Sequence, residues 1–270
     1  MQRLLRTVLV ALSLVVARAV CAGDVEDGEA AFFRHEYTIA LKKYKSAAAR
    51  NNVYAQLQVG NFYNEGLGVV QDHAEAVRWY KMAAAQGHAD AQSNLGFMYE
   101  KGRGVVQDYV ESVNWYKLSA AQGFAEAQAN LGVMYSKGLG VVQDYTEAVR
   151  LYKLAAAQGQ TDAQSNLGYM YSKGLGVVQD YAEAVRLYKL SAAHGQPDAQ
   201  SNLGFMYEKG RGVAQDYVRA YMWVDLAAVS GHTTALKNRD IIAIKMSTQQ
   251  IAEAQKMAKN CQARHFKNCD

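Results

Sequence analysis

The residues best suited to covalent chemistry in this sequence are Cys261 and Cys269, close to its C-terminus. The third cysteine of the chain, Cys21, lies in an N-terminal segment that we expect to be removed. An even pair of cysteines in an oxidising compartment favours a disulfide. The alternative is a metal site with His265 as a third ligand, although the usual spacing of four zinc ligands is absent. We predict a disulfide between Cys261 and Cys269.

Nucleophilic or metal-dependent catalysis has no comparable support. The chain contains neither Gly-x-Ser-x-Gly nor Ser-x-x-Lys with its partner motifs, and it contains no His-Glu-x-x-His helix or phosphate-binding loop. Ser93, Ser165 and Ser201 share one repeated position with Ala129, which indicates packing of small side chains. Because no group of reactive residues interrupts the repeat, we predict that the protein is not an enzyme and uses no cofactor.

The elements that carry these residues repeat every 36 residues. The Gln-Asp pairs that mark the period are at residues 71–72, 107–108, 143–144, 179–180 and 215–216. A period of this size is typical of helix pairs that stack into a solenoid. We therefore predict an all-α fold, an αα-solenoid superhelix of about six helix-turn-helix repeats with a C-terminal capping helix. Such folds offer extended surfaces, which favours binding over catalysis.

Local signals within one repeat support two helices. Asp108 followed by Glu111 is an acidic N-terminal capping pattern, and Gly123 suits a helix C-terminus. The second helix follows over residues 125–137 and contains Gly132, for which we expect close approach of the Ala-Ala run of the paired helix. At the N-terminal end, residues 30–50 are expected to form a weaker first helix.

Three recurring motifs resemble Sel-1-like repeats, relatives of the tetratricopeptide repeat. They are Ala-Glu-Ala-Val-Arg-x-Tyr-Lys-x-Ala-Ala-x-Gln-Gly, Ala-Gln-x-Asn-Leu-Gly-x-Met-Tyr and Gly-x-Gly-Val-x-Gln-Asp, spread over residues 37–236. The resemblance implies a scaffold or adaptor that binds other proteins, in the cell envelope or in contact with a host. Its cysteine-rich branch has a similar Cys-x7-Cys spacing and implies an alternative, a protein that binds or hydrolyses β-lactams or peptidoglycan.

One departure from the family pattern concerns the start of the second helix, where Asp or Asn is common. This chain has other residues there, so we expect polar caps to be lost at this edge. The residues are His88, Phe124, Gln160, Gln196 and His232.

The organisation along the chain predicts export. Residues 1–22 have a basic start, an apolar run over 8–17 and small residues before Gly23, which is typical of a signal peptide. Lipidation at Cys21 is an alternative. We expect the solenoid over 23–236 and a cap with the disulfide over 237–270, in the periplasm or outside the cell. No later apolar stretch approaches 18 residues, so we expect no membrane span in the mature form.

The charge of the mature chain argues against nucleic acid as a partner. The full chain has 29 basic and 25 acidic residues, and residues 1–22 hold Arg3, Arg6 and Arg18 but no acid. The remaining net charge of +1 lacks the basic excess typical of polyanion binding. We expect a monomer that binds a protein partner which the sequence does not identify.

Positions that vary within the fixed frame are candidates for the interaction surface. Aromatic residues often anchor interfaces, and a row of arginines could contact acidic groups. The alternatives are packing between repeats for the aromatic residues and ordinary solvated charge for the arginines. The candidates are Phe97, Tyr169, Phe205, Trp79, Trp115, Trp223, Arg78, Arg150 and Arg186.

Overall fold

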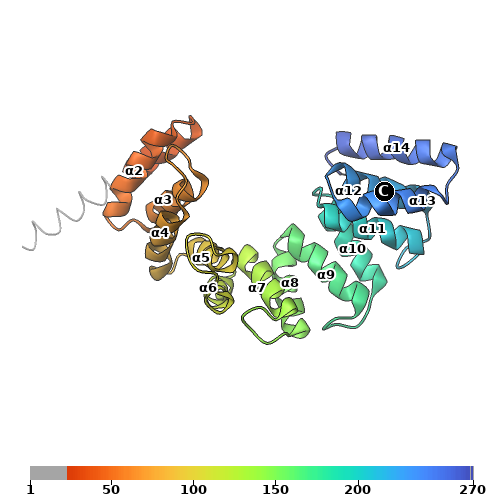
Figure 1. Ribbon diagram of the computed structural model, residues 1–270, viewed down its shortest axis with the longest axis horizontal. Helices are drawn as coiled ribbons and strands as arrows, with labels where there is room; N and C mark the ends of the chain where they lie inside the picture. Colours follow the sequence, from red (N-terminus) through yellow and green to blue (C-terminus); the bar gives the residue numbers. More distant parts are fainter. Residues whose placement is uncertain (1–22, 268, 270) are drawn as a thin grey trace, which may run out of the picture. The chain divides into compact units, whose positions relative to one another are not determined.

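The computed structural model describes residues 23–267 and 269, and Figure 1 shows its succession of helices. These residues form helices without strands, and consecutive helices pack as pairs, which confirms the predicted all-α solenoid. A helix over 23–33 comes first. It is followed by α2 (Tyr37–Ala49), α3 (Val53–Glu65), α4 (His73–Ala85), α5 (Ala89–Lys101), α6 (Tyr109–Ala121), α7 (Ala125–Lys137), α8 (Tyr145–Ala157), α9 (Thr161–Lys173), α10 (Tyr181–Ala192), α11 (Pro197–Lys209), α12 (Tyr217–Val229), α13 (Thr233–Ala243) and α14 (Thr248–Ala263).

The six pairs from α2 to α13 match the expected number of repeats. The N-terminal end differs from the prediction, because the expected single helix over 30–50 is interrupted. His35 adopts a left-handed backbone with φ of 60°, which ends the first helix at 33 and lets α2 begin at Tyr37. The expected signal peptide over 1–22 lies outside the described residues. No helix in the described part is long and apolar enough to cross a membrane.

The chain divides into two compact units, Met1–Ala127 and Gln128–Asp270, and the division falls within α7. Within the N-terminal unit, each helix from α2 to α5 packs against its successor. Within the C-terminal unit, the same is true from α8 to α12, and α12 packs against both α13 and α14. Each helix therefore buries its apolar face against its sequence neighbours, as expected for a solenoid.

First helices of the repeats begin at the predicted aspartates. Oδ1 of Asp144 accepts hydrogen bonds from the backbone N–H groups of Thr146 at 2.9 Å and Glu147 at 3.0 Å. These bonds pair two amides that have no partner within the first turn. Tyr152, later in the same helix, is 1% exposed and packs toward the preceding second helix.

The glycine inside α3, α5, α7 and α9 accommodates this tyrosine and not the Ala-Ala run that we expected, whereas Gly204 of α11 faces Val224. A Cβ atom added to Gly132 would lie 2.7 Å from Cε1 of Tyr152, and one added to Gly168 would lie 2.9 Å from Cε1 of Tyr188. Contacts below 3.0 Å are not tolerated without movement of the ring. The helices approach closely because glycine leaves room for a large aromatic side chain.

The expected loss of polar caps on the second helices is wrong for two of them. The side chain of Gln160 accepts a hydrogen bond from Ala163 N at 2.5 Å, and Nδ1 of His232 accepts one from Ala235 N at 3.1 Å. Longer side chains thus supply the oxygen or nitrogen that Asp or Asn would supply. His88 and Gln196, by contrast, make no side-chain cap hydrogen bond.

The C-terminal cap explains why the last repeat departs from the pattern. Met222 and Leu226 are fully buried, whereas their counterparts in α10, Arg186 and Leu190, are exposed. In the last repeat α14 packs against α12, so this face of α12 must be apolar. Ser247 starts α14 with a capping box.

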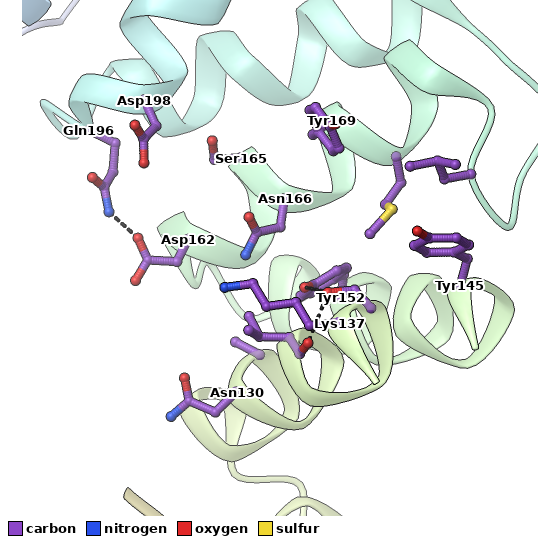
Figure 2. Close-up of a pocket in the computed structure, with 15 residues that line it drawn as sticks. Asn130, Lys137, Tyr145, Tyr152, Asp162, Ser165, Asn166, Tyr169, Gln196 and Asp198 are labelled. Atoms are coloured by element: carbon purple, nitrogen blue, oxygen red, sulfur yellow. Dashed lines mark hydrogen bonds between the residues drawn. The ribbon is translucent and has the colours of Figure 1, made fainter. Parts of the chain in front are cut away.

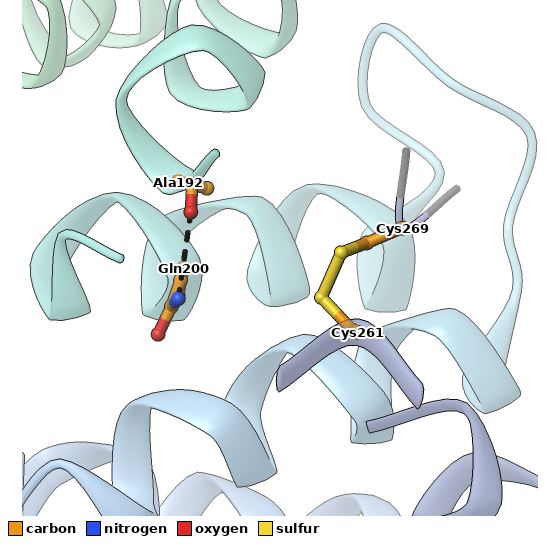
Figure 3. Close-up of a disulfide and its surroundings, with 4 residues drawn as sticks. All are labelled: Ala192, Gln200, Cys261 and Cys269. Carbon is orange, nitrogen blue, oxygen red and sulfur yellow. Dashed lines mark hydrogen bonds between the residues drawn. A yellow bond between two sulfur atoms is a disulfide. The ribbon is translucent and has the colours of Figure 1, made fainter. Parts of the chain in front are cut away.

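The disulfide holds the end of the chain to α14. Figure 3 shows Cys261 and Cys269 bonded, with their Cα atoms 5.1 Å apart. Both sulfurs are used, so the alternative metal site with His265 is not formed. Phe266, within the closed loop, packs against the apolar cluster that contains α12. The predicted boundary of the cap at residue 237 falls within α13.

Candidate functional site

The candidate arginines are already paired along the first helices. Arg150 donates two hydrogen bonds of 2.7 Å to Glu147, and Arg186 contacts Glu183 in the same way. Arg78 lies 3.0 Å from Glu75. Hydrogen bonding to the carboxylates raises the pKa of Arg150 and of Arg186. These exposed pairs are ordinary i, i+3 contacts on a helix surface.

The tryptophan candidates do not form one surface. Trp223 is 3% exposed in the core around α12, so it has no surface to offer a partner, and the equivalent Leu151 and Leu187 are buried as well. Trp79 is partly buried and donates from Nε1 to Glu75 at 2.9 Å. Trp115 is also partly buried. Trp223 therefore fits the alternative interpretation, in which the aromatic candidates pack between repeats.

The aromatic residues of the second helices are more accessible. Tyr169 is 44% exposed and Phe205 is 37% exposed, and both line two adjoining pockets of the C-terminal unit. Phe97 holds the same repeat position in the N-terminal unit, where Lys101 and Arg103 lie over its ring. The structure therefore brings together two of the predicted candidates and places the third in the other unit.

Three adjoining pockets in the C-terminal unit form a continuous groove over α7, α9, α11 and α13. The largest, of about 500 Å³, includes Asn130 and Asn166, and Figure 2 shows Asn166 and Lys137 directed into it. A second pocket of about 330 Å³ shares Asn166 and adds Asn238, and a third of about 200 Å³ includes Asn202. We call this surface the asparagine groove.

Each helix along the asparagine groove contributes one asparagine, at positions 130, 166, 202 and 238. All four side chains are partly buried, yet none forms a hydrogen bond with another residue in the described part of the chain. A side-chain amide has two N–H donors and an acceptor oxygen. Partly buried amides without partners inside the protein are available to pair with the N–H and C=O groups of a bound chain.

The asparagine row was not predicted from the sequence. Asn166 belongs to the recurring Asn-Leu-Gly motif, which we interpreted only as a mark of the repeat. The available signal was a polar residue that recurs every 36 residues on a helix whose adjacent positions, such as Leu167, are buried. Sequence alone could not show that the amides lack internal partners.

A serine, a histidine and an aspartate line one part of the groove but do not form a nucleophilic triad. His232 lies 2.9 Å from Asp198 through Nε2, while its Nδ1 accepts the hydrogen bond from Ala235 N. Both ring nitrogens are therefore occupied, and neither is available to take a proton from Ser201, which lines the same pocket.

Two tyrosines at the base of the groove remain protonated at neutral pH. Burial raises the pKa of Tyr152 and of Tyr188 to about 12. Their hydroxyl groups can donate or accept hydrogen bonds, but they do not supply a negative charge. Together with the amides, they add neutral hydrogen-bonding groups to the lining of the asparagine groove.

Comparisons with known proteins agree with the fold and the repeat. The Sel1 repeat family model matches five consecutive segments, residues 53–88, 89–124, 125–160, 161–196 and 197–232. This chain is similar to a Sel1 repeat protein from Oxalobacter formigenes of known crystal structure, with 33% sequence identity. The match covers 87% of this chain and 96% of that chain, with a TM-score of 0.77. A putative Sel1 repeat protein from Klebsiella pneumoniae subsp. pneumoniae is 21% identical over 75% of this chain and 99% of that chain, with a TM-score of 0.51, and shares the fold. Comparison with the curated proteins gave no match.

Proposed function

Because the chain belongs to the Sel1 repeat family, we propose that it is a scaffold that binds a segment of another protein in the asparagine groove. The observation that carries this proposal is the row of partly buried asparagine amides that form no hydrogen bond with any other described residue. Tyr169 and Phe205 add exposed aromatic surface beside the row. Aromatic side chains are frequent anchors in protein interfaces.

A row of one asparagine per repeat suits an extended chain. A segment that crosses α7, α9, α11 and α13 would meet the four asparagines in turn. Each amide could pair with backbone groups of the segment, so affinity would come from its main chain and selectivity from the adjoining side chains.

Binding, and not turnover, is the activity that we propose for this protein. The protonated tyrosines and the fully occupied His232 provide no base for a nucleophile in the groove. A β-lactam- or peptidoglycan-hydrolysing protein would need such a base or another activated group.

We also propose that the protein acts after export, in the periplasm or outside the cell. The disulfide between Cys261 and Cys269 supports this proposal, because such bonds persist mainly in oxidising compartments. The sequence of residues 1–22 supports it independently. Expression in its host with N-terminal sequencing of the exported product tests it: we expect a chain that begins at Gly23, and an unprocessed chain retained in the cytoplasm would contradict export.

Peptide binding tests the proposed groove directly. We would pan the purified protein against a random library of twelve-residue peptides and measure the affinities of selected peptides by fluorescence anisotropy. Asn166→Ala should weaken binding about tenfold, because it removes a two-point contact with the main chain. Asn114→Ala is the matched control and should leave affinity unchanged. Asn114 is exposed on α6, which is the first helix of its repeat and lies outside the groove. Equal affinities for the two variants would refute the proposal.

A further inference from the structure

The smallest pocket of the asparagine groove carries two cations that the proposed function does not yet use. Lys173 at the end of α9 and Arg211 in the loop after α11 both line this pocket of about 200 Å³. Neither has a carboxylate partner among the described residues. Asn202, one of the free amides, lines the same pocket. Two positive charges and an amide donor thus surround a space without a negative group.

Aromatic rings hold these cations in place. The guanidinium carbon of Arg211 lies 5.4 Å from the ring centre of Tyr181 and 5.5 Å from that of Phe205, and Nζ of Lys173 lies 5.8 Å from that of Tyr169. A guanidinium group over a ring keeps its N–H edge available for a carboxylate. The rings therefore restrict the arginine without neutralising its charge.

The repeat shows that this combination of charges is particular to one place in the chain. The positions equivalent to Lys173 and Arg211 hold, in the three preceding repeats, Glu65 with Arg103, Lys101 with Leu139, and Lys137 with Leu175. The residue before the lysine also differs. Glu100 and Glu208 contact the lysines that follow them, whereas Ser172 hydrogen bonds to the backbone oxygen of Tyr169 and Lys173 has no counterion within residues 23–267.

We infer that this pocket binds a carboxylate of the segment that occupies the asparagine groove. Arg211 can donate two parallel hydrogen bonds to the two carboxylate oxygens, while Lys173 supplies a second positive charge and Asn202 a further N–H donor. This inference rests on the proposed function, because the carboxylate belongs to the segment that the asparagine row would hold. A carboxylate could come from an Asp or Glu side chain or from the C-terminus of the partner.

The chain itself supplies substitutions that keep the fold. Arg211→Leu places at this position the residue found at Leu139 and Leu175, and Lys173→Glu reproduces Glu65. Arg103→Leu is the matched control, because it makes the same change in the N-terminal unit. Peptides selected from the random library described above would be titrated into the original protein and all three variants, and circular dichroism would verify that each variant is folded.

We expect the selected peptides to share a carboxylate at one position. Their affinity for the Arg211→Leu variant should be about tenfold lower than for the original protein, and their affinity for the Lys173→Glu variant should be lower still. Arg103→Leu should have no effect. Amidation of the peptide C-terminus and replacement of Asp or Glu by Asn or Gln distinguish the two sources of the carboxylate, and loss of affinity in either arm supports the inference.

The two proposals fail in different ways. Peptides whose binding depends on Asn166 but is unaffected by Arg211→Leu would overturn the carboxylate pocket and leave the asparagine groove as a peptide site. Absence of any peptide binding that depends on Asn166 would overturn both proposals. The salt dependence of peptide affinity is a second test. Affinity for a carboxylate in this exposed pocket should fall as ionic strength rises, and an affinity unchanged by salt would count against the inference.

Discussion

Gln158 donates a hydrogen bond from its side-chain amide to Oε1 of Gln128 at 2.9 Å and thereby joins consecutive repeats of the C-terminal unit. The N-terminal unit has the same arrangement at two places, where Gln122 contacts Gln92 and Gln86 contacts Gln56, each at 2.7 Å. The acceptor glutamines are buried, so the bond pairs an oxygen that water does not reach.

This chain of glutamine contacts stops in the last repeats. The donor position holds His194 and then Ser230, and Oε1 of Gln164 and of Gln200 is left buried without a hydrogen bond. Gln200 is fully buried, and Figure 3 shows its amide directed at the backbone oxygen of Ala192. A buried acceptor without a partner reduces stability.

Ser230→Gln should therefore stabilise the protein. Ser230 lies at the C-cap of α12, as Gln158 does for α8, with similar backbone angles. A glutamine there can donate to Gln200, and we expect a gain of about 1 kcal/mol in the free energy of unfolding. Urea unfolding followed by circular dichroism measures it. The reciprocal variant Gln158→Ser should cost about 1–3 kcal/mol, and an unchanged urea midpoint in both variants would contradict this account.

Gly132→Ala should destabilise the protein even though alanine is the better helix former. Alanine gains about 1 kcal/mol in helix propensity. Its Cβ would lie 2.7 Å from Cε1 and 2.8 Å from Cδ1 of the buried Tyr152, and overpacking of this kind costs about 1–3 kcal/mol. Urea unfolding of Gly132→Ala, Tyr152→Leu and the double variant tests the contact. If the losses in the free energy of unfolding for the two single variants add up to the loss for the double variant, the close approach of Gly132 and Tyr152 does not limit stability.

Much of the fold could be predicted because its signals are local and repeated. Asp144 caps its helix through backbone amides two and three residues away, and the 36-residue period fixed the number of helix pairs before any contact was known. The start of the second helix was harder to predict. A glutamine or histidine can cap a helix only if its longer side chain turns back, as Gln160 and His232 do.

The candidate site depended on contacts that a repeat pattern does not contain. Trp223 looked equivalent to Trp79 and Trp115, but it is 3% exposed and belongs to the apolar core around α12. Asn166 looked like part of the repeat pattern, and only the positions of the neighbouring donors and acceptors show that its side chain bonds to no other described residue. Tyr169 and Phe205 were candidates because aromatic residues at a position that varies between repeats suggest contact, and the structure adds that both are exposed.

Breaking the disulfide should loosen the C-terminal cap. The bond closes a loop with a sequence separation of 8 between Cys261 and Cys269, and the chain-entropy model assigns such a loop about 2.5 kcal/mol. We expect Cys269→Ser to lower the free energy of unfolding by about this amount, and reductant to lower it equally in the original protein but not in the variant. A reductant effect that persists in Cys269→Ser would show that this bond is not the cause.

Glu208 should link the stability of the cap to acidic pH. Its carboxylate contacts Nζ of Lys245 at 2.6 Å and Nζ of Lys209 at 3.0 Å, so it ties α11 to the segment between α13 and α14. Burial by itself would raise the pKa of Glu208, but hydrogen bonds and charge attraction from the two lysines outweigh burial and lower the pKa below its ordinary value of 4.5.

A lowered pKa in the folded state makes the contribution of Glu208 complete above about pH 4.5 and lost as the pH falls through the folded value. Glu208→Gln should therefore be less stable than the original protein at pH 7, and the difference should shrink steadily below pH 4.5. Urea midpoints between pH 7 and pH 3 measure this. Glu100→Gln is the matched control, because Glu100 contacts Lys101 and accepts a hydrogen bond from the hydroxyl of Tyr116 but contacts no lysine of the cap. A difference that stays constant down to pH 3 would mean that the ionised carboxylate does not hold the cap.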